Sequence, residues 1–114
     1  MFVGAARVEL RIHGSRSLKE KRGVVRSIIQ RLRNRFNVSV AEVDGQDTWQ
    51  RAVLGLAGVG SDAQDLRVRL EKAIDFVADL HLAEVMDQEV EVQPTPLTAE
   101  PHWEPREEDP EEDE

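Results

Sequence analysis

Hydrophobic and polar residues alternate along residues 2–13. One side of the alternation carries Phe2, Gly4, Ala6, Val8, Leu10 and Ile12, and the other carries Val3, Ala5, Arg7, Glu9, Arg11 and His13. A period of two is typical of a strand with one buried face. Gly14, Ser15 and Arg16 then interrupt the alternation. We therefore predict a first strand over residues 2–13.

The spacing of apolar residues becomes helical after Ser17. Ser17 and Glu20 are spaced as a capping box, in which a hydroxyl and a carboxylate each accept a hydrogen bond from a free amide at the helix start. The apolar residues that follow at helical spacing are Leu18, Val25, Ile28, Ile29, Leu32 and Phe36. At the helical turn angle they occupy an arc about 100° wide, which predicts a helix with one face against the core. We expect it to end at Asn37.

The remaining pattern adds two strands, a helix and a fourth strand. Residues 37–44 are rich in β-branched side chains, and Asp44-Gly45 opens a turn to an apolar stretch over 49–60. A helix is expected from Ser61 or Asp62, and residues 83–92 alternate again. The order β-α-β-β-α-β predicts an α+β, ferredoxin-like sandwich, with four antiparallel strands and both helices on one face.

Composition divides the chain into two parts. Residues 93–114 contain all five prolines and nine acids against Arg106. Such a segment has too few apolar side chains to offset the entropy of ordering, so we predict a domain over 1–92 and a disordered acidic tail over 93–114. The chain has no cysteine, and its start lacks the pattern of a secretory signal. A cytoplasmic protein without disulfides is the expectation.

The net charge of −8 conceals unlike segments within the predicted domain. Residues 1–36 carry ten Lys/Arg against two acids, and residues 37–92 carry four against twelve. The domain is therefore neutral overall, but its first third is strongly basic. Lys19, Lys21 and Arg22 lie in the first turns of the predicted helix, where the helix dipole disfavours cations by about 0.3–1 kcal/mol each. This cost invites a functional explanation.

A basic surface on the first helix is the main candidate site. Lys19, Arg22, Arg26 and Arg33 fall within about 60° of one another on a helical projection, beside the apolar arc. Lys and Arg bind nucleic-acid phosphates without needing base contacts. The candidate nucleic-acid-binding residues are Arg16, Lys19, Arg22, Arg26, Arg33 and Arg35. Acids of the second helix, of a partner subunit or of the tail, which also carries Trp103, are competing anions.

The segments SLKEKR, RFNVSVAEVD and QDTWQRA, within residues 17–55, resemble the bacterial YlxP-like family, a domain of unknown function. The resemblance spans roughly residues 1–92 and leaves out the acidic tail. It implies a ferredoxin-like fold in small bacterial cytoplasmic proteins whose genes often lie among those for translation initiation and ribosome maturation. It supplies no catalytic residues. The leading hypothesis is an accessory protein that binds structured RNA or a ribosomal particle.

The third strand suggests a second surface. Helices cover one face of the predicted sheet, so apolar side chains on the other face need a different cover. The candidate dimer-face residues are Val3, Ala5, Val53, Ala57 and Val59. A second copy in a two-fold dimer is the simplest cover. The alternative function is therefore a homodimeric protein–protein interaction module, whose basic helix is neutralised by protein carboxylates, the acidic tail included.

Catalytic and metal chemistry is not indicated. His13, His81 and His102 lie far apart without paired spacing, which argues against a metal site. Glu42, Asp44 and Asp47 cluster near the predicted hairpin, where turn chemistry explains them better than a weak Mg²⁺ site. No nucleophile and base order stands out. We expect no enzymatic activity, cofactor, small-molecule substrate or membrane attachment.

Overall fold

A computed structural model describes residues 1–97 of the chain. Its elements are β1 (Phe2–Arg11), α1 (Leu18–Arg35), β2 (Ser39–Asp44), β3 (Arg51–Gly60), α2 (Ala63–Asp79) and β4 (Glu84–Pro94). This order confirms the predicted β-α-β-β-α-β sequence, with every element within two residues of its expected bounds. None of the helices in this part of the chain is both long and apolar enough to cross a membrane.

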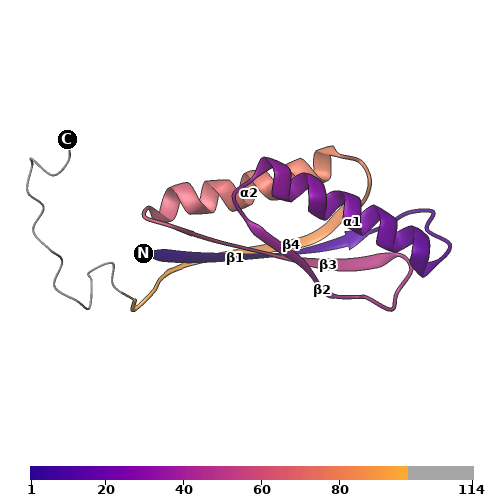
Figure 1. Ribbon diagram of the computed structural model, residues 1–114, viewed down its shortest axis with the longest axis horizontal. Coiled ribbons are helices and arrows are strands. Elements are labelled where there is room, and N and C mark those ends of the chain that lie inside the picture. Colours follow the sequence, from indigo (N-terminus) through magenta and orange to yellow (C-terminus); the bar gives the residue numbers. More distant parts are fainter. Residues whose placement is uncertain (98–114) are drawn as a thin grey trace, which may run out of the picture.

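The four strands form one antiparallel sheet in the order β2-β3-β1-β4. Both helices lie on the same face of this sheet, which confirms the ferredoxin-like α+β fold (Figure 1). The other face, which we call the open face, carries no helix from the described residues. The first and last strands are neighbours, so the two ends of the domain lie side by side: Phe2 pairs with Pro94, and the Thr95 amide donates to the Met1 carbonyl at 3.1 Å.

The last strand runs two residues further than its predicted end at 92, because β1 begins at Phe2 and still offers a partner at Pro94. The first residues of the predicted tail, up to Pro94, are therefore part of the sheet. The remainder of that tail from 98 to 114, including Trp103 and His102, lies outside the described residues.

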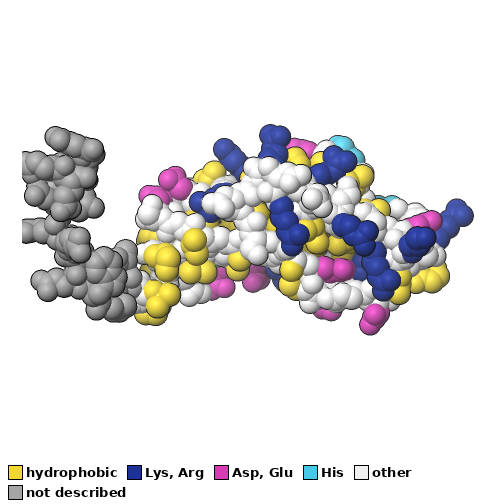
Figure 2. All heavy atoms as spheres, in the orientation of Figure 1, with side chains coloured by type: hydrophobic (Ala, Val, Ile, Leu, Met, Phe, Trp, Pro, Cys, Tyr) yellow, Lys and Arg dark blue, Asp and Glu magenta, His cyan; other side chains and the backbone are white. Residues whose placement is uncertain are grey.

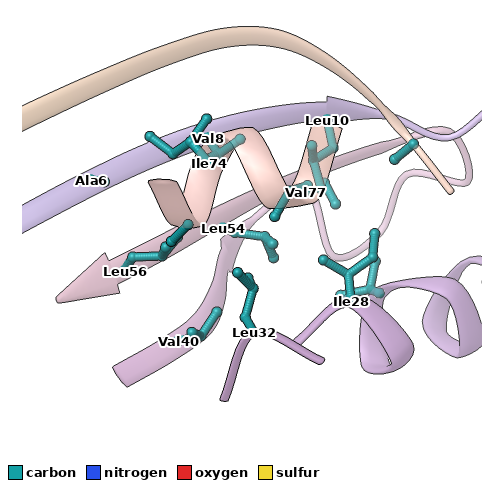
Figure 3. Close-up of a cluster of buried hydrophobic side chains, with 14 of the residues drawn as sticks. Ala6, Val8, Leu10, Ile28, Leu32, Val40, Leu54, Leu56, Ile74 and Val77 are labelled. Carbon is teal, nitrogen blue, oxygen red and sulfur yellow. The ribbon is translucent and has the colours of Figure 1, made fainter. Parts of the chain in front are cut away.

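The core lies between the sheet and the two helices (Figure 3). Val8 and Leu54 come from adjacent strands, Leu32 from α1, and Val77 from α2, and all four are fully buried. Buried branched side chains of this kind each contribute about 1.5–3 kcal/mol by leaving water. Phe36 follows the last turn of α1, and Phe76 lies in the last turn of α2. Their rings meet edge to face, with centroids 5.5 Å apart.

Both helices begin at a residue that caps them. Ser17 Oγ accepts a hydrogen bond from the Glu20 amide at 3.1 Å, as the predicted capping box requires. The Glu20 carboxylate, however, accepts from the Arg16 amide at 2.7 Å and not from that of Ser17. In α2, Asp62 Oδ1 accepts from the Asp65 amide at 2.9 Å. Both side chains of the predicted capping box therefore accept from backbone amides at the start of α1, with Glu20 reaching one residue before the N-cap.

Candidate nucleic-acid interface

The exposed side of α1 carries the predicted basic residues. Arg16, Lys19, Arg22, Arg26, Arg33 and Arg35 are all solvent-exposed. Figure 2 shows Lys and Arg side chains spaced along the surface that α1 forms in this view. Within residues 1–97, no carboxylate lies within 4.0 Å of the charged groups of these six residues. We call Lys19, Arg22, Arg26 and Arg33 the basic stripe.

Two of the six candidate residues also hold the fold together. Arg33 Nη2 donates to the Val40 carbonyl at 2.7 Å, which ties the end of α1 to the edge strand β2. The Arg35 guanidinium lies over the Phe76 ring, 5.3 Å from its centroid, in a cation–π contact. Arg35 therefore points toward α2, whereas Arg33 lies on the β2 side. The structure does not bring Arg35 together with the stripe.

Lys21 belongs to the core side of α1, although its charge suggested the surface. Its side chain is fully buried, and Nζ lies 2.8 Å from Glu42 Oε2 in β2. Nζ also donates to the Gly45 carbonyl at the turn into β3. The contact with Glu42 is a close ion pair without hydrogen-bond geometry, and Oε2 has no other polar partner within the described residues. The unfavourable position of the Lys21 charge near the start of the helix is therefore explained by its contacts with Glu42 and Gly45, and no ligand is needed to explain it.

Sequence reasoning missed this pair, although a signal for it was present. The buried residues of α1 are Lys21, Val25, Ile28 and Leu32, spaced by four, three and four. Lys21 thus falls within the apolar arc on a helical projection, and a lysine in that position needs a buried partner. Glu42 is the matching acid, in the strand that follows α1.

The acids of α2 do not neutralise the stripe. The spacing of Asp65 and Arg69 predicts an ion pair within α2, but Arg69 Nη1 donates instead to the carbonyls of Asn37 and Val59, at 3.2 Å each. Both carbonyls belong to residues beyond the first pair of the β2–β3 ladder, Ser39 with Ala57, where another donor can reach them. Arg69 therefore joins α2 to the sheet, and the helices share no ion pair within the described residues.

The hairpin acids do not assemble a metal site. Asp44 Oδ1 accepts from the Gly45 amide at 2.7 Å, and Gly45 has a φ of +82°, which favours glycine. The Glu42 carboxylate is paired with Lys21, so it is not a second ligand beside Asp44. Within residues 1–97, no three His, Asp or Glu side chains converge as metal ligands.

The open face divides into an apolar end and a charged end. At the apolar end, Val3 pairs directly with Val59, and Ala5 with Ala57. All four side chains are exposed; Val3 keeps 42% and Val59 56% of its surface accessible. We call these four residues the apolar patch. Hollows of about 330 Å³ lie on each side of it, and Val3 lines both.

Val53 does not belong to this patch, contrary to the prediction. It is only 3% exposed, although its register places it on the open face. Its neighbours there are Glu9, directly across in β1, and Arg51, and these two form an ion pair of 2.9 Å. Val43 covers the adjacent Gly55, where an added Cβ would lie 2.9 Å from a valine methyl. Val53 is therefore screened by its own chain and is unavailable to a partner.

The charged end of the open face is internally paired. Arg7 Nη2, on the central strand β1, lies 2.9 Å from Asp87 Oδ2 on the neighbouring edge strand β4. The hydrogen bond from Arg7, then that from the Gln88 amide, and the positive charge of Arg7 hold the pKa of Asp87 below its ordinary value. These groups satisfy each other, so this end offers fewer free charges than α1 does.

Together, the fold and the exposed cations of α1 define a ferredoxin-like α+β protein with a basic helical surface. Residues 3–90 match the family described as "Protein of unknown function (DUF503)", so the chain belongs to that family. It is 41% identical over 76 residues to "Uncharacterized protein YlxP" of Bacillus subtilis (strain 168), an alignment that covers 67% of this chain and 83% of that protein. The predicted resemblance is thereby confirmed.

Among solved structures, the chain is similar to "De novo designed protein Foldit4". The TM-score is 0.42 and the sequence identity 15%, over 85% of this chain and 98% of the designed one.

Proposed function

We propose that this protein is a non-enzymatic cytoplasmic accessory factor that binds structured RNA through the basic stripe of α1. The observation that carries the proposal is the lack of ion pairs: no described carboxylate reaches the charged groups of the stripe, whereas Glu9, Glu42 and Asp87 are each paired with another cation. Exposed unpaired cations on one rigid helix gain most from an external polyanion, because phosphates release counterions when they bind. The gene context implied by the resemblance favours RNA of the translation apparatus, free or within a ribosomal particle.

The stripe suits phosphate contacts better than base reading by the sheet. An RNA-binding sheet of the RRM type stacks bases on aromatic side chains of its central strands. The central strands β1 and β3 carry Arg7, Glu9, Gly55 and Ala57 on the open face, and no aromatic side chain. We therefore expect binding to depend strongly on salt and weakly on sequence.

Filter binding of ribosomal RNA against salt concentration tests the proposal. The test variant combines Lys19→Glu, Arg22→Glu and Arg26→Glu. The control variant combines Arg11→Glu, Arg67→Glu and Lys72→Glu, which gives the same net charge with changes away from α1. We expect the test variant to lose at least about tenfold in affinity at low salt, with a slope shallower by about three. Equal losses of RNA affinity in both variants would mean that net charge, and not the stripe, determines binding. If the RNA affinity of the wild type did not depend on salt, the proposal of RNA binding through phosphate contacts would be refuted.

The acidic segment outside the described residues competes with RNA for the stripe in a variant of this proposal. Residues 98–114 carry nine acids and Arg106. If this segment competes with RNA, its removal should raise RNA affinity at low salt. Unchanged affinity would exclude the competition and leave the stripe assignment intact.

A second candidate function is homodimerisation through the apolar patch. Its support is the exposure of Val3, Ala5, Ala57 and Val59 in two directly paired rungs. Light scattering at micromolar concentration distinguishes a monomer from a dimer. Val3→Glu with Val59→Glu should give a monomer if the patch is the interface, while Val43→Glu, an equally exposed valine on β2, serves as the control. A wild-type monomer would remove this candidate.

A further inference from the structure

A hollow of about 640 Å³ lies beside the first three turns of α1, on the side away from β2. Its lining is mostly apolar and comes from three places: Ile12 at the end of β1, Val24 on α1, and Leu82 in the connection to β4. Leu82 is 37% exposed, although it is a large aliphatic residue. The hollow is wide and open to solvent, so it could hold one face of a flat ligand without enclosing it.

Gly23 forms part of this hollow and has no internal reason to be glycine. A Cβ at this position would meet no atom within 4 Å, and its φ is not positive. Glycine within a helix lowers its stability relative to alanine. By contrast, Gly4 and Gly58 are needed for packing, since an added Cβ would approach Leu66 and its neighbours closely. The packing of the described residues therefore does not require a glycine at position 23. A ligand in the hollow would require one, because a side chain there would take up part of its space.

The rim of the hollow supplies the polar groups. Lys19 lines the hollow and also begins the basic stripe, so a molecule seated here would have a cation of the stripe beside it. The His13 ring is held at the rim by a contact of 2.7 Å between Nε2 and Glu84 Oε1. Glu20 is committed to the Arg16 amide. The rim thus combines the His13 ring, the exposed cation of Lys19 and the Glu20 carboxylate, so an anion seated here would have to lie on the Lys19 side.

We propose that this hollow receives an unpaired RNA base, with the adjoining phosphates on Lys19 and Arg22. This inference rests on the proposed function, since it uses the same stripe. The faces of bases inside an A-form duplex are stacked and inaccessible, whereas unpaired nucleotides can splay a base onto a histidine ring or an apolar surface. The hollow would therefore select RNA with unpaired nucleotides, and the stripe alone would bind duplex and single strand alike.

The test compares a mixed-sequence single-stranded oligoribonucleotide with the duplex that it forms with its complement. Fluorescence anisotropy is measured for the wild type and for Gly23→Leu, whose side chain would fill the hollow. Gln64→Leu, which adds the same side chain at an exposed position of α2, is the control. We expect the wild type and the control to prefer the single strand by about tenfold, the worth of one stacked base. Gly23→Leu should lose this preference and keep the duplex affinity.

Folding is checked independently of binding. Gly23→Ala should raise the melting temperature by roughly 2–8 °C while it weakens the single-strand preference, a combination that a purely structural role cannot produce. If Gly23→Leu keeps the preference, or if the wild type has none, the hollow is not a base site and the stripe assignment stands. If the wild type binds neither RNA at low salt, the proposed function and this inference both fail.

Discussion

Lys19 and Lys21 are two residues apart on the same helix and have opposite roles. Lys21 lies on the inner face of α1 and is fully buried against Glu42, whereas Lys19 lies on the outer face without a described acidic partner. The same side chain is a structural element in one case and a free charge in the other. The charge of a helix therefore does not measure its binding surface until the face of each cation is known.

The largest effect should come from breaking the buried pair. Lys21→Met leaves the partly buried Glu42 carboxylate, whose Oε2 is buried, without a cation, and we expect a loss of about 3–5 kcal/mol in the free energy of unfolding. Lys19→Met, the matched change on the outer face, should stay within about 0.5 kcal/mol of the wild type. Urea unfolding followed by circular dichroism measures both. Similar losses in the two variants would contradict the distinction between the faces.

A second experiment separates the cost of an unpaired charge from the worth of the pair. The double variant Lys21→Met with Glu42→Leu removes both charges and leaves apolar side chains between α1 and β2. Because burying two ions costs nearly as much as their attraction returns, we expect the double variant to recover about 2–4 kcal/mol of the single-variant loss. The same unfolding curves give the coupling energy. A double variant as unstable as Lys21→Met would show that the pair itself supplies the stability.

A smaller effect is expected at the two helix starts. Ser17→Ala and Asp62→Ala each remove one side-chain acceptor from a backbone amide, at Glu20 and Asp65 respectively. Each should cost about 1 kcal/mol in the free energy of unfolding. Ser17→Ala should also leave the stripe's RNA affinity within about twofold of the wild type, since the cap lies outside it. A large affinity loss would mean that the start of α1 frays and carries the binding residues with it.

The smallest change in stability is expected at the exposed ion pair Arg7–Asp87 on the open face, in contrast to the buried pair of Lys21 and Glu42. The pKa of Asp87 is lowered by the hydrogen bond from Arg7, so the folded state favours the carboxylate. Its stabilising contribution is present at neutral pH, above the unfolded pKa, and is lost as the pH falls through the folded pKa, below about pH 4. The urea midpoint of Asp87→Asn should therefore lie slightly below that of the wild type at pH 7 and coincide with it near pH 2. A difference that persists in acid would have another origin.

The fold could be predicted from periodicity alone because its burial is simple. Alternation over 2–13 and helical spacing after Ser17 report which faces meet the core, and one helix-covered sheet satisfies them all. The environments of two basic residues of α1, Lys21 and Arg35, were not predicted, although the projection placed the four stripe residues together. Lys21 shares the apolar arc, and Arg35 points to Phe76, a contact between helices that no local pattern reveals.

The burial of Val53 could not be predicted from the sequence, for a related reason. Alternation placed it correctly on the open face, but burial there depends on the Arg51 and Glu9 side chains, which come from different strands. The apolar patch was predicted in its other four positions, since neighbouring strands need only the correct register to bring Val3 beside Val59. Local pattern thus determines faces, and contacts across strands determine exposure.

The hydrogen bond between the Thr95 amide and the Met1 carbonyl has a practical consequence for engineering. Both ends of the domain leave the sheet together, at the pole opposite the start of α1 (Figure 1). A fluorophore or affinity handle fused at Met1 therefore starts far from Lys19 and the adjoining hollow. A short linker between the ends would also permit circular permutation, with new termini opened in the exposed connection around Gln46 and Asp47.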